Sequence, residues 1–480
     1  MSRINTNVTA LISSRILNTS NGDMNKSLER LSTGLRINRG SDDPAGLIAS
    51  ENLRKQIRGT ETAINNAERA VNVISTAEGS LAEMNAMLVD LQGLLSEVAN
   101  SGGMSTEEIN ANQSQVDSIL NTIDRISNSA EFEGIKLLNG NLDYTTGTLP
   151  ASIADSTVKA AKLIDGASMT VALAVTTSAN TGVAFLSGAA LSTANMTIRI
   201  GSNRGTTDLT LAAATTQANV QTAINAVKEI TGVSAATSAG AIALRSVDFG
   251  ADAYVSVTIL SGQHDATDTF VLNTDNASNN ASATDTGIDA VATINGVSAN
   301  ADGKILSVRT SMLDAEIELT ASAAMATTSA SFTITGGGAD FAIGSLVDAV
   351  GLESIGIQNM ATTSLGNATD GYINTLKSGG TNSLTSSNLY TAQNIVTSAI
   401  KDVSNLRGRL GSFQKNTLET TINSLNVATE NLYAAESAIR DTDFATETSK
   451  LTRAQILVQA STMTLQAANM APQAVLSLLG

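Results

Sequence analysis

The feature that most constrains this chain is a pair of long helical seams, one toward each end of the sequence. From Leu81 to Val98 the apolar residues recur in alternating steps of three and four, the spacing of a coiled-coil seam. A second seam runs from Val396 to Ile439, in a helix expected to begin near Leu389. Because each seam needs a partner, we expect the two ends of the chain to lie side by side. The residues between them then form an insert in a loop of this bundle, where long insertions are tolerated.

The segment from Leu28 to Leu53 reads LERLSTGLRINRGSDDPAGLIASENL. Its first leucines are spaced as on one face of a helix, and glycines and Pro44 then interrupt the pattern. Asp42 and Asp43 favour the start of a new helix at Pro44. The segment therefore predicts a short helix, a hinge and a second helix.

The two ends of the chain carry narrow apolar stripes that lack a partner within their own segments. The stripe of residues 1–41 contains Ile4, Val8, Leu11, Met24, Leu28, Leu31 and Leu35. The expected partner stripe, in residues 445–480, contains Leu451, Ile456, Met463, Leu465, Val475 and Leu478. A lone helix of this kind is marginal in water, so we expect both ends to become ordered on assembly with neighbouring copies.

Residues 141–336 differ from the rest, because they are rich in Ala, Thr, Ser and Gly and contain alternating runs typical of strands. They carry 16 acidic and 8 basic residues, so this insert is acidic. Residues 195–260 predict strand, strand, helix, strand and strand, and a hairpin is expected at 305–309 and 315–320.

The composition argues against catalysis. The chain has no cysteine, no tryptophan and one histidine, and its formal net charge is -16. We therefore expect no catalytic residues, no metal site and no cofactor, and the negative charge disfavours nucleic acid or anionic membrane as a partner. His264 lacks companion ligands, and Asp265 and Asp268 lack the remaining ligands of a calcium loop.

No apolar run reaches membrane-spanning length, and polar residues interrupt the first ten positions where an apolar signal core would lie. The residues alone thus predict no cleaved signal peptide and a cytoplasmic protein.

Two long motifs resemble a known family. The string LERLSTGLRINRGSDDPAGLIASENLR resembles the N-terminal signature of bacterial flagellins, and the string from Asn431 to Gly480, NLYAAESAIRDTDFATETSKLTRAQILVQASTMTLQAANMAPQAVLSLLG, resembles their C-terminal signature. The likeness covers roughly residues 1–140 and 337–480 and fades between them. It implies a structural subunit that polymerises into the helical flagellar filament outside the cell. It also implies export, unfolded and uncleaved, through the flagellum's own channel, which replaces the cytoplasmic prediction.

The resemblance implies a mainly α fold with a β-rich insert. Residues 1–43 and 441–480 would form a terminal coiled-coil core domain. Residues 44–145 and 337–440 would form a helical bundle with a β-hairpin at 131–140. Residues 146–336 would form outer β-rich lobes, divided at about 146–275 and 286–336.

The family also implies partners and contact residues. The partners are further copies of the chain, an export chaperone, and the filament cap and hook–filament junction proteins. For the axial-core subunit interface we expect Leu28, Leu31, Leu35, Ile37, Leu476, Leu478 and Leu479. For chaperone binding, by resemblance, we expect Leu451, Ile456, Leu457, Met463 and Leu465.

Flagellins also present a surface to a vertebrate Toll-like receptor, and the matching stretch here is residues 88–100. Leu94 agrees with the usual pattern, whereas Asp90 stands in place of Arg and Gln115 in place of Glu. Exchanging a cation for an anion reverses the local electrostatics, so we expect weak or absent receptor activation.

Other functions stay open from the sequence. A hook–filament junction protein shares the terminal plan but usually matches the two signatures less well. The insert could also make the protein a surface adhesin or a secreted enzyme, although no nucleophile, base or metal constellation supports an enzyme.

Overall fold

The computed structural model describes residues 6–100, 103–163, 167–187, 195–213, 215–238, 241–261, 271–273, 282–346, 348, 350–368, 370–386 and 388–476. The side chains of residues 187, 271–273 and 471–476 are outside this description. The chain forms two compact units, each assembled from separated stretches of sequence. Unit 1 comprises Met1–Ala70, Ala342–Val347 and Lys415–Gly480, and unit 2 comprises Val71–Phe341 and Asp348–Gln414.

Unit 1 is helical and brings the two ends of the chain together. Its helices are α1 (Val8–Thr33), the first part of α2 (Pro44–Val98), α8 (Thr420–Arg440) and α9 (Phe444–Leu476). α1 starts where the Asn7 side chain accepts a hydrogen bond from the Ala10 amide, and it ends at Gly34 in the left-handed conformation. The predicted start of α2 is confirmed, since the Asp43 carboxylate accepts a hydrogen bond from the Gly46 amide at 2.9 Å.

A short backbone junction joins the bases of α1 and α9. Leu35 and Asp441 form an antiparallel bridge. The Arg36 amide donates to the Arg440 carbonyl at 2.7 Å, and the Thr442 amide donates to the Gly34 carbonyl at 2.9 Å. The hinge predicted after Leu35 is therefore an ordered connection.

Unit 2 contains the helical bundle that the two seams predict. Its helices are the later part of α2, α3 (Thr106–Ser129) and α7 (Leu389–Phe413). Their fully buried residues are mostly large and follow the coiled-coil spacing: Ile74, Leu81, Met84, Leu88, Leu91, Leu95, Val116, Leu120, Ile123, Val396, Val403, Leu406 and Leu410. α3 begins with a capping box, in which the side chains of Ser105 and Glu108 accept hydrogen bonds from each other's backbone amides. The helix predicted from Leu389 onward is interrupted by a π-helical segment, Gln414–Glu419, before α8.

The return segment that precedes α7 is held by polar side chains of α3. The Asp124 carboxylate accepts hydrogen bonds from the Thr362 amide at 2.8 Å and from the Lys377 ammonium at 3.0 Å. Gln113 donates to the Leu376 carbonyl at 2.9 Å and accepts from the Leu384 amide at 2.8 Å. The segment contains β20 (Ala339–Ala342), β21 (Leu352–Ile355), β22 (Gly366–Asn367), β23 (Gly371–Tyr372) and the 3-10 helix Ile373–Leu376. The predicted hairpin is confirmed as β1 (Glu131–Phe132) and β2 (Ile135–Lys136).

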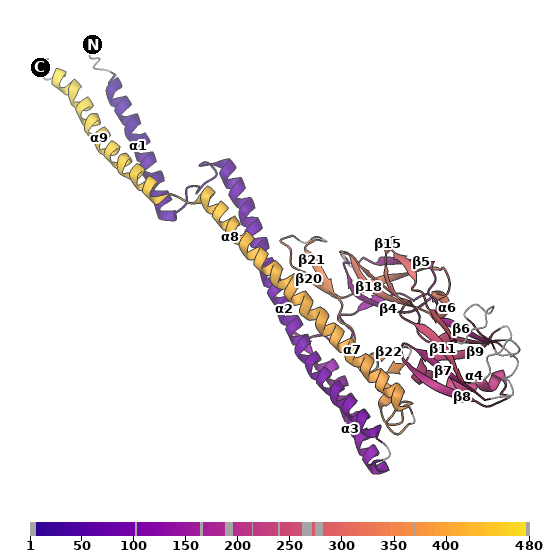
Figure 1. Ribbon diagram of the computed structural model, residues 1–480. Helices are drawn as coiled ribbons and strands as arrows, with labels where there is room; N and C mark the ends of the chain where they lie inside the picture. Colours follow the sequence, from indigo (N-terminus) through magenta and orange to yellow (C-terminus); the bar gives the residue numbers. More distant parts are fainter. Residues whose placement is uncertain are drawn as a thin grey trace. The chain divides into compact units, whose positions relative to one another are not determined.

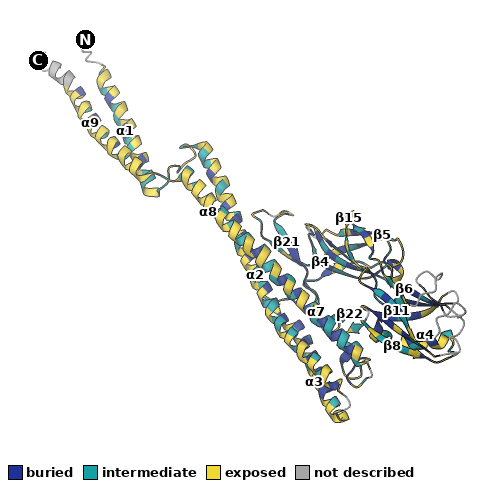
Figure 2. Ribbon diagram, in the orientation of Figure 1, coloured by how far each residue is buried: buried dark blue, intermediate teal, exposed yellow. Residues whose placement is uncertain are grey.

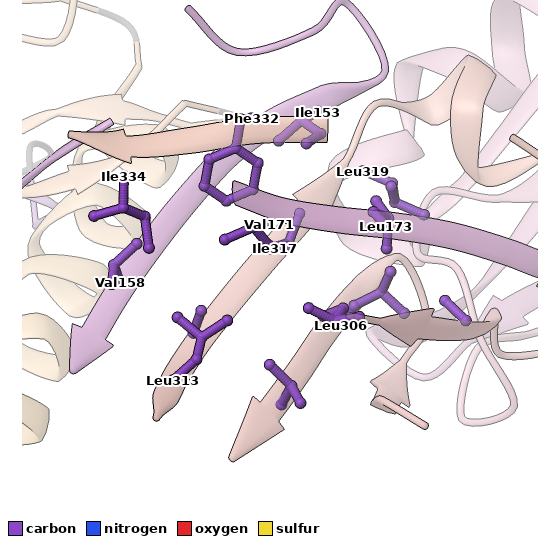
Figure 3. Close-up of a cluster of buried hydrophobic side chains, with 14 of the residues drawn as sticks. Ile153, Val158, Val171, Leu173, Leu306, Leu313, Ile317, Leu319, Phe332 and Ile334 are labelled. Carbon is purple, nitrogen blue, oxygen red and sulfur yellow. The ribbon is translucent and has the colours of Figure 1, made fainter. Parts of the chain in front are cut away.

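The first outer lobe is built from two antiparallel sheets whose strands come from both sides of the insert. One sheet has the order β15-β14-β5-β19-β3 and the other β16-β17-β18-β4. The strands are β3 (Tyr144–Thr146), β4 (Ile153–Ala161), β5 (Met169–Thr177), β14 (Val291–Ile294), β15 (Val297–Ser298), β16 (Asn300–Asp302), β17 (Ile305–Arg309), β18 (Leu313–Leu319) and β19 (Ser329–Gly337), with helix α6 (Ala321–Ala324). Figure 3 shows their shared core, in which Val171, Ile317 and Phe332 lie close together.

The second outer lobe, residues 183–286, has a core of its own. Its sheets have the orders β12-β6-β10-β9 and β13-β11-β7-β8. Its elements are β6 (Val183–Ser187), β7 (Met196–Ser202), β8 (Gly205–Leu211), α4 (Gln217–Ala226), α5 (Lys228–Thr231), β9 (Val233–Ser238), β10 (Ala241–Ser246), β11 (Tyr254–Ser261), β12 (Val271–Asn273) and β13 (Ser282–Thr286). The strand–strand–helix–strand–strand order predicted for 195–260 is confirmed, with β11 as a further strand.

The division of the insert at about 146–275 and 286–336 differs from the structure. β4 pairs with β18, and β5 pairs with β14 and β19, so the first lobe is discontinuous and the second is inserted into it. β13 lies almost entirely between the two expected lobes, yet it pairs with β11 of the second lobe. The physical reason is that strand pairing is non-local, and local composition does not reveal it.

Candidate assembly interface

α1 and α9 lie antiparallel along their length, so that the start of α1 lies beside the last part of α9 (Figure 1). Near the base of the pair the Ser27 hydroxyl donates to the Glu447 carboxylate at 2.8 Å. Near the other end the Asn7 side-chain amide donates to the Ala468 carbonyl at 2.8 Å. The predicted partnership between the two chain ends is therefore confirmed.

The seam between the two helices is made of small residues spaced seven apart. On α1 the buried residues are Ser13, Ser20 and Ser27. On α9 they are Glu447, Ala454, Ser461 and Ala468. Half-buried larger residues alternate with them, namely Leu17, Met24, Leu31, Leu451, Val458 and Leu465. Both helices thus use a heptad repeat, but apart from Glu447 small side chains occupy its most buried positions.

Several other large apolar residues of the two helices are exposed and lie outside this seam. On α1 they include Val8, Ile12, Ile16 and Leu11, and Leu11 is 64% exposed. On α9, Ile456, Met463 and Met470 recur every seven residues, and Met463 is 69% exposed. We call these seven residues the outer patches. Figure 2 shows the helix pair as mostly exposed.

α9 carries two heptad stripes on opposite sides. Ile456 follows Glu447 by nine residues, and Met463 follows Ala454 by nine. Nine residues are two and a half turns of an α-helix, so the second stripe lies diametrically opposite the first. The stripe that faces α1 is occupied within the chain, whereas Ile456, Met463 and Met470 are exposed, and none of the described helices covers them.

A polar cluster closes the base of the pair. The Glu447 side chain is 5% exposed and lies 3.1 Å from the Lys450 ammonium and 3.8 Å from the Arg30 guanidinium. Burial raises the pKa of Glu447, but hydrogen bonds from Ser27 and Lys450 outweigh it, and the net pKa lies below its ordinary value. The carboxylate is therefore ionised at neutral pH.

The expected axial-core residues are placed differently from one another. Leu28 is 45% exposed, Leu31 and Leu35 are half-buried, and Ile37 is 1% exposed, inside unit 1. The Leu476 backbone ends α9, but its side chain, and all of Leu478 and Leu479, lie outside the described residues. The expectation that Val8, Leu11 and Leu28 face α9 is wrong, because serines occupy that face of α1.

The residues expected to bind a chaperone divide between two faces of α9. Leu451 and Leu465 lie half-buried in the seam with α1. Ile456, Leu457 and Met463 are exposed. A partner that covers all five residues would therefore have to take the place of α1.

Of the residues expected on the receptor surface, Asp90 and Gln115 are exposed and Leu94 is half-buried. Asp90 and Leu94 belong to α2 and Gln115 to α3, all within unit 2.

Within the described residues, no group of three or more acidic, histidine or cysteine side chains is arranged to hold a metal ion. His264, Asp265 and Asp268 lie outside the described residues. Over the same described part of the chain, none of the helices has an apolar stretch that could span a bilayer.

Comparisons with known proteins agree with the two helical ends. The model of the bacterial flagellin N-terminal helical region matches residues 4–143, and that of the C-terminal helical region matches residues 393–479. A flagellin of Clostridium tyrobutyricum is 29% identical over 98% of this chain and 100% of its own length. A flagellin of Salmonella choleraesuis is 28% identical over 99% of each chain. A flagellin of Bacillus subtilis is 41% identical over 30% of this chain and 48% of its own.

Proposed function

Because this chain belongs to the bacterial flagellin family and is a structural subunit of the flagellar filament, we propose that the outer patches of α1 and α9 make its contacts with neighbouring subunits. The filament is an extracellular appendage, and a subunit contact at the chain ends gives each copy two different surfaces to present. Contacts between unlike surfaces do not close on themselves, so they build an open helical polymer.

One observation carries this proposal: in the terminal helix pair the most buried residues are mostly small, whereas the seven large residues of the outer patches are exposed. Burial of a Leu, Ile or Met side chain contributes about 1.5–3 kcal/mol. α1 and α9 forgo most of that contribution while they are alone. A neighbouring subunit that covers the outer patches would supply it, offset by the cost of ordering the helices and fixing the partner.

The spacing of the α9 outer patch indicates what covers it. Ile456, Met463 and Met470 form one edge of a heptad seam, and Ala460 and Ala467 complete the alternating steps of four and three. Such a seam fits another helix that packs at the same spacing. We therefore propose a helix of a neighbouring copy as the occupant of this face.

The remaining expectations stand as proposals. Residues 1–43 with 441–480 form the core domain, and 44–145 with 337–440 the surrounding bundle. The axial contacts include Leu28, Leu31 and Leu35 together with Leu476, Leu478 and Leu479, and a polar substitution at Leu31 blocks assembly without unfolding the bundle. Ile37 supports the subunit's interior instead of a contact surface.

We propose further that the chain leaves the cell unfolded and without a cleaved signal peptide, and that it has no catalytic role. An export chaperone would cover Leu451, Ile456, Leu457, Met463 and Leu465 before assembly. The filament cap and hook–filament junction proteins would contact its ends in the assembled flagellum. With Asp90 and Gln115 in its receptor-facing stretch, the protein would activate the vertebrate receptor weakly.

The test is polymerisation of the purified chain, seeded with sheared filament fragments and observed by electron microscopy. Met463→Glu places a charge in the outer patch of α9 and is expected to abolish growth, whereas the matched control Ile230→Glu changes an exposed apolar residue of α5 and is expected to polymerise normally. Normal growth of Met463→Glu would exclude this face from the contact. Failure of the unaltered chain to grow on the seeds would contradict the proposal as a whole.

A further inference from the structure

The seam between α1 and α9 nearly repeats itself every seven residues. Ser13, Ser20 and Ser27 are identical, and Ala454, Ser461 and Ala468 on the other helix are similar in size. A slip of one heptad would move α1 by about 10 Å along α9 and place like residues against like. The small-residue layers therefore fit several registers and do not by themselves select the observed one.

One layer differs from the others because it contains a buried charge. In the observed register the Ser27 hydroxyl donates to Glu447 at 2.8 Å, and the Arg30 guanidinium lies 3.8 Å from the same carboxylate. The equivalent positions on α9 one and two heptads later are Ala454 and Ser461, which are uncharged. A buried polar group at one heptad position is the device best known to fix the register of paired helices.

The Glu447 carboxylate would have different neighbours in the two slipped registers. If α1 moves so that Ser20 faces Glu447, the residue that replaces Arg30 is Asp23, seven positions earlier. Ser20 could still donate a hydrogen bond, but Asp23 would bring a second negative charge to a buried carboxylate. If α1 moves the other way, Glu447 would face Gly34, beyond the end of the helix, and would lose its hydroxyl donor.

We propose that Glu447 sets the register of α1 against α9 by pairing with Ser27 and Arg30, and that Asp23 disfavours the seven-residue slip. The inference rests on the proposed function, because the register determines how the outer patches of the two helices line up for a neighbouring subunit. Arg30 supports the assignment, since its guanidinium lies 3.8 Å from the same carboxylate oxygen that accepts the hydrogen bond from Ser27.

A second feature could also hold the register. The bridge between Leu35 and Asp441 ties the two backbones near the base of the pair. It lies eight residues from Ser27 and six from Glu447 along the chain. The experiment must therefore separate the carboxylate from the bridge, and variants that alter only side chains within α1 and α9 do so.

Cysteine pairs can report the register because the chain has no cysteine of its own. Ser20→Cys with Ala454→Cys reports the observed register, since Ser20 and Ala454 line the same groove. Ser13→Cys with Ala454→Cys reports the slip that brings Asp23 to Glu447, and Ser20→Cys with Ser461→Cys reports the opposite slip. A shift of about 10 Å exceeds the reach of a disulfide, so each pair responds to one register.

Disulfide formation is measured in full-length protein, in filaments and in solution, by mass spectrometry of the linked peptides. With native residues at 23, 30 and 447, only the Ser20–Ala454 pair is expected to link. In Glu447→Ala both slip reporters are expected to link as well. Glu447→Gln keeps the hydrogen bond from Ser27 but removes the charge. Its side chain should no longer favour Arg30 over Asp23, so the Ser13–Ala454 pair is expected to link alongside the Ser20–Ala454 pair.

A charge exchange makes the test independent of whether Glu447→Ala folds. Asp23→Arg combined with Arg30→Asp keeps the composition and is expected to transfer linkage to the Ser13–Ala454 pair. If this variant and Glu447→Ala both link only at Ser20–Ala454, the bridge sets the register and the proposal is overturned. If the protein with only Ser20→Cys and Ala454→Cys grows filaments without forming this disulfide, the observed register of α1 against α9 is absent there. That result overturns the proposal on the register, while the proposed function stands.

Discussion

The helix pair at the chain ends and the helical bundle of unit 2 use the same heptad spacing, but residues of opposite size occupy the buried positions. In the bundle, large residues such as Leu88 and Leu120 are fully buried. In the terminal pair, serines and alanines are buried, whereas Leu11 and Met463 face solvent. The bundle thus completes its core within one chain. The terminal pair leaves its largest side chains for a partner, which is the arrangement expected of helices that complete their core only when a neighbouring subunit packs on them.

The largest expected effect comes from truncating one large residue in each region. Leu88→Ala should lower the free energy of unfolding of the monomer by about 2–5 kcal/mol, because it leaves a cavity in the bundle. Met463→Ala should change it by less than about 0.5 kcal/mol, because the side chain is exposed. Urea unfolding followed by circular dichroism measures both. Equal losses would mean that Met463 is buried within the monomer and would remove the contrast between the regions.

Enlarging a buried residue of the α1–α9 seam tests whether its buried positions require small side chains. Ser20→Leu should destabilise the α1–α9 pair by about 1–3 kcal/mol, because a large side chain does not fit the small-residue layer. Ser20→Ala keeps the size and should be tolerated. The measurement is the temperature at which filaments dissociate. If Ser20→Leu filaments were as stable as the unaltered ones, the seam would have room for large residues.

The polar contacts of α3 allow a test within the bundle. Asp124→Ala removes the acceptor of three hydrogen bonds, from the Thr362 amide, the Thr362 hydroxyl and Lys377, and should cost about 1–3 kcal/mol. Burial raises the pKa of Asp124, but these bonds outweigh it, and the net pKa is below its ordinary value. The contribution is therefore present at neutral pH and is lost as the pH falls through the lowered pKa. A penalty for Asp124→Ala that persisted unchanged to strongly acidic pH would contradict this account.

The smallest expected effect concerns Asp402 on α7. Burial raises the pKa of Asp402 to about 6, despite a hydrogen bond from the Gly366 amide. The folded state therefore holds its proton more tightly than the unfolded state, so stability falls as the pH rises from 3.8 to about 6, and the full penalty of the ionised carboxylate is present above pH 6. Asp402→Asn should stabilise unit 2 by about 1 kcal/mol at pH 8, allowing for partial exposure, and should have no effect below pH 3.8. Equal stability of the two proteins at pH 8 would show that the carboxylate carries no burial penalty.

The sequence predicted much of this architecture because helices and their seams are local patterns. The bundle stripe from Leu81 to Val98 and the pairing of the chain ends were both available from spacing. The buried face of α1 was not found, because a search for apolar stripes selects Val8 and Leu11 over serines. The signal was nevertheless present in the seven-residue spacing of Ser13, Ser20 and Ser27.

The strand pairing and the boundary of the outer lobes could not be predicted from local sequence patterns. β4 and β18 are more than 150 residues apart in the sequence yet adjacent in one sheet. Composition suggested a boundary near residue 280, but β13 continues the second lobe there. The contact residues of the filament are also only partly predictable, since they depend on which face of each terminal helix is already occupied within the chain.

Methionine oxidation tests the central claim most directly, because the chain carries its own probes in both regions. Met463 and Met470 are exposed in the outer patch of α9, whereas Met84 is fully buried in the bundle. Oxidation to the sulfoxide follows exposure, and mass spectrometry gives the rate at each residue. We predict that Met463 and Met470 react quickly in the monomer and become strongly protected in filaments, while Met84 stays slow in both. Oxidation of Met463 at the same rate in filaments as in monomers would contradict the account, because its side chain would then face solvent after assembly.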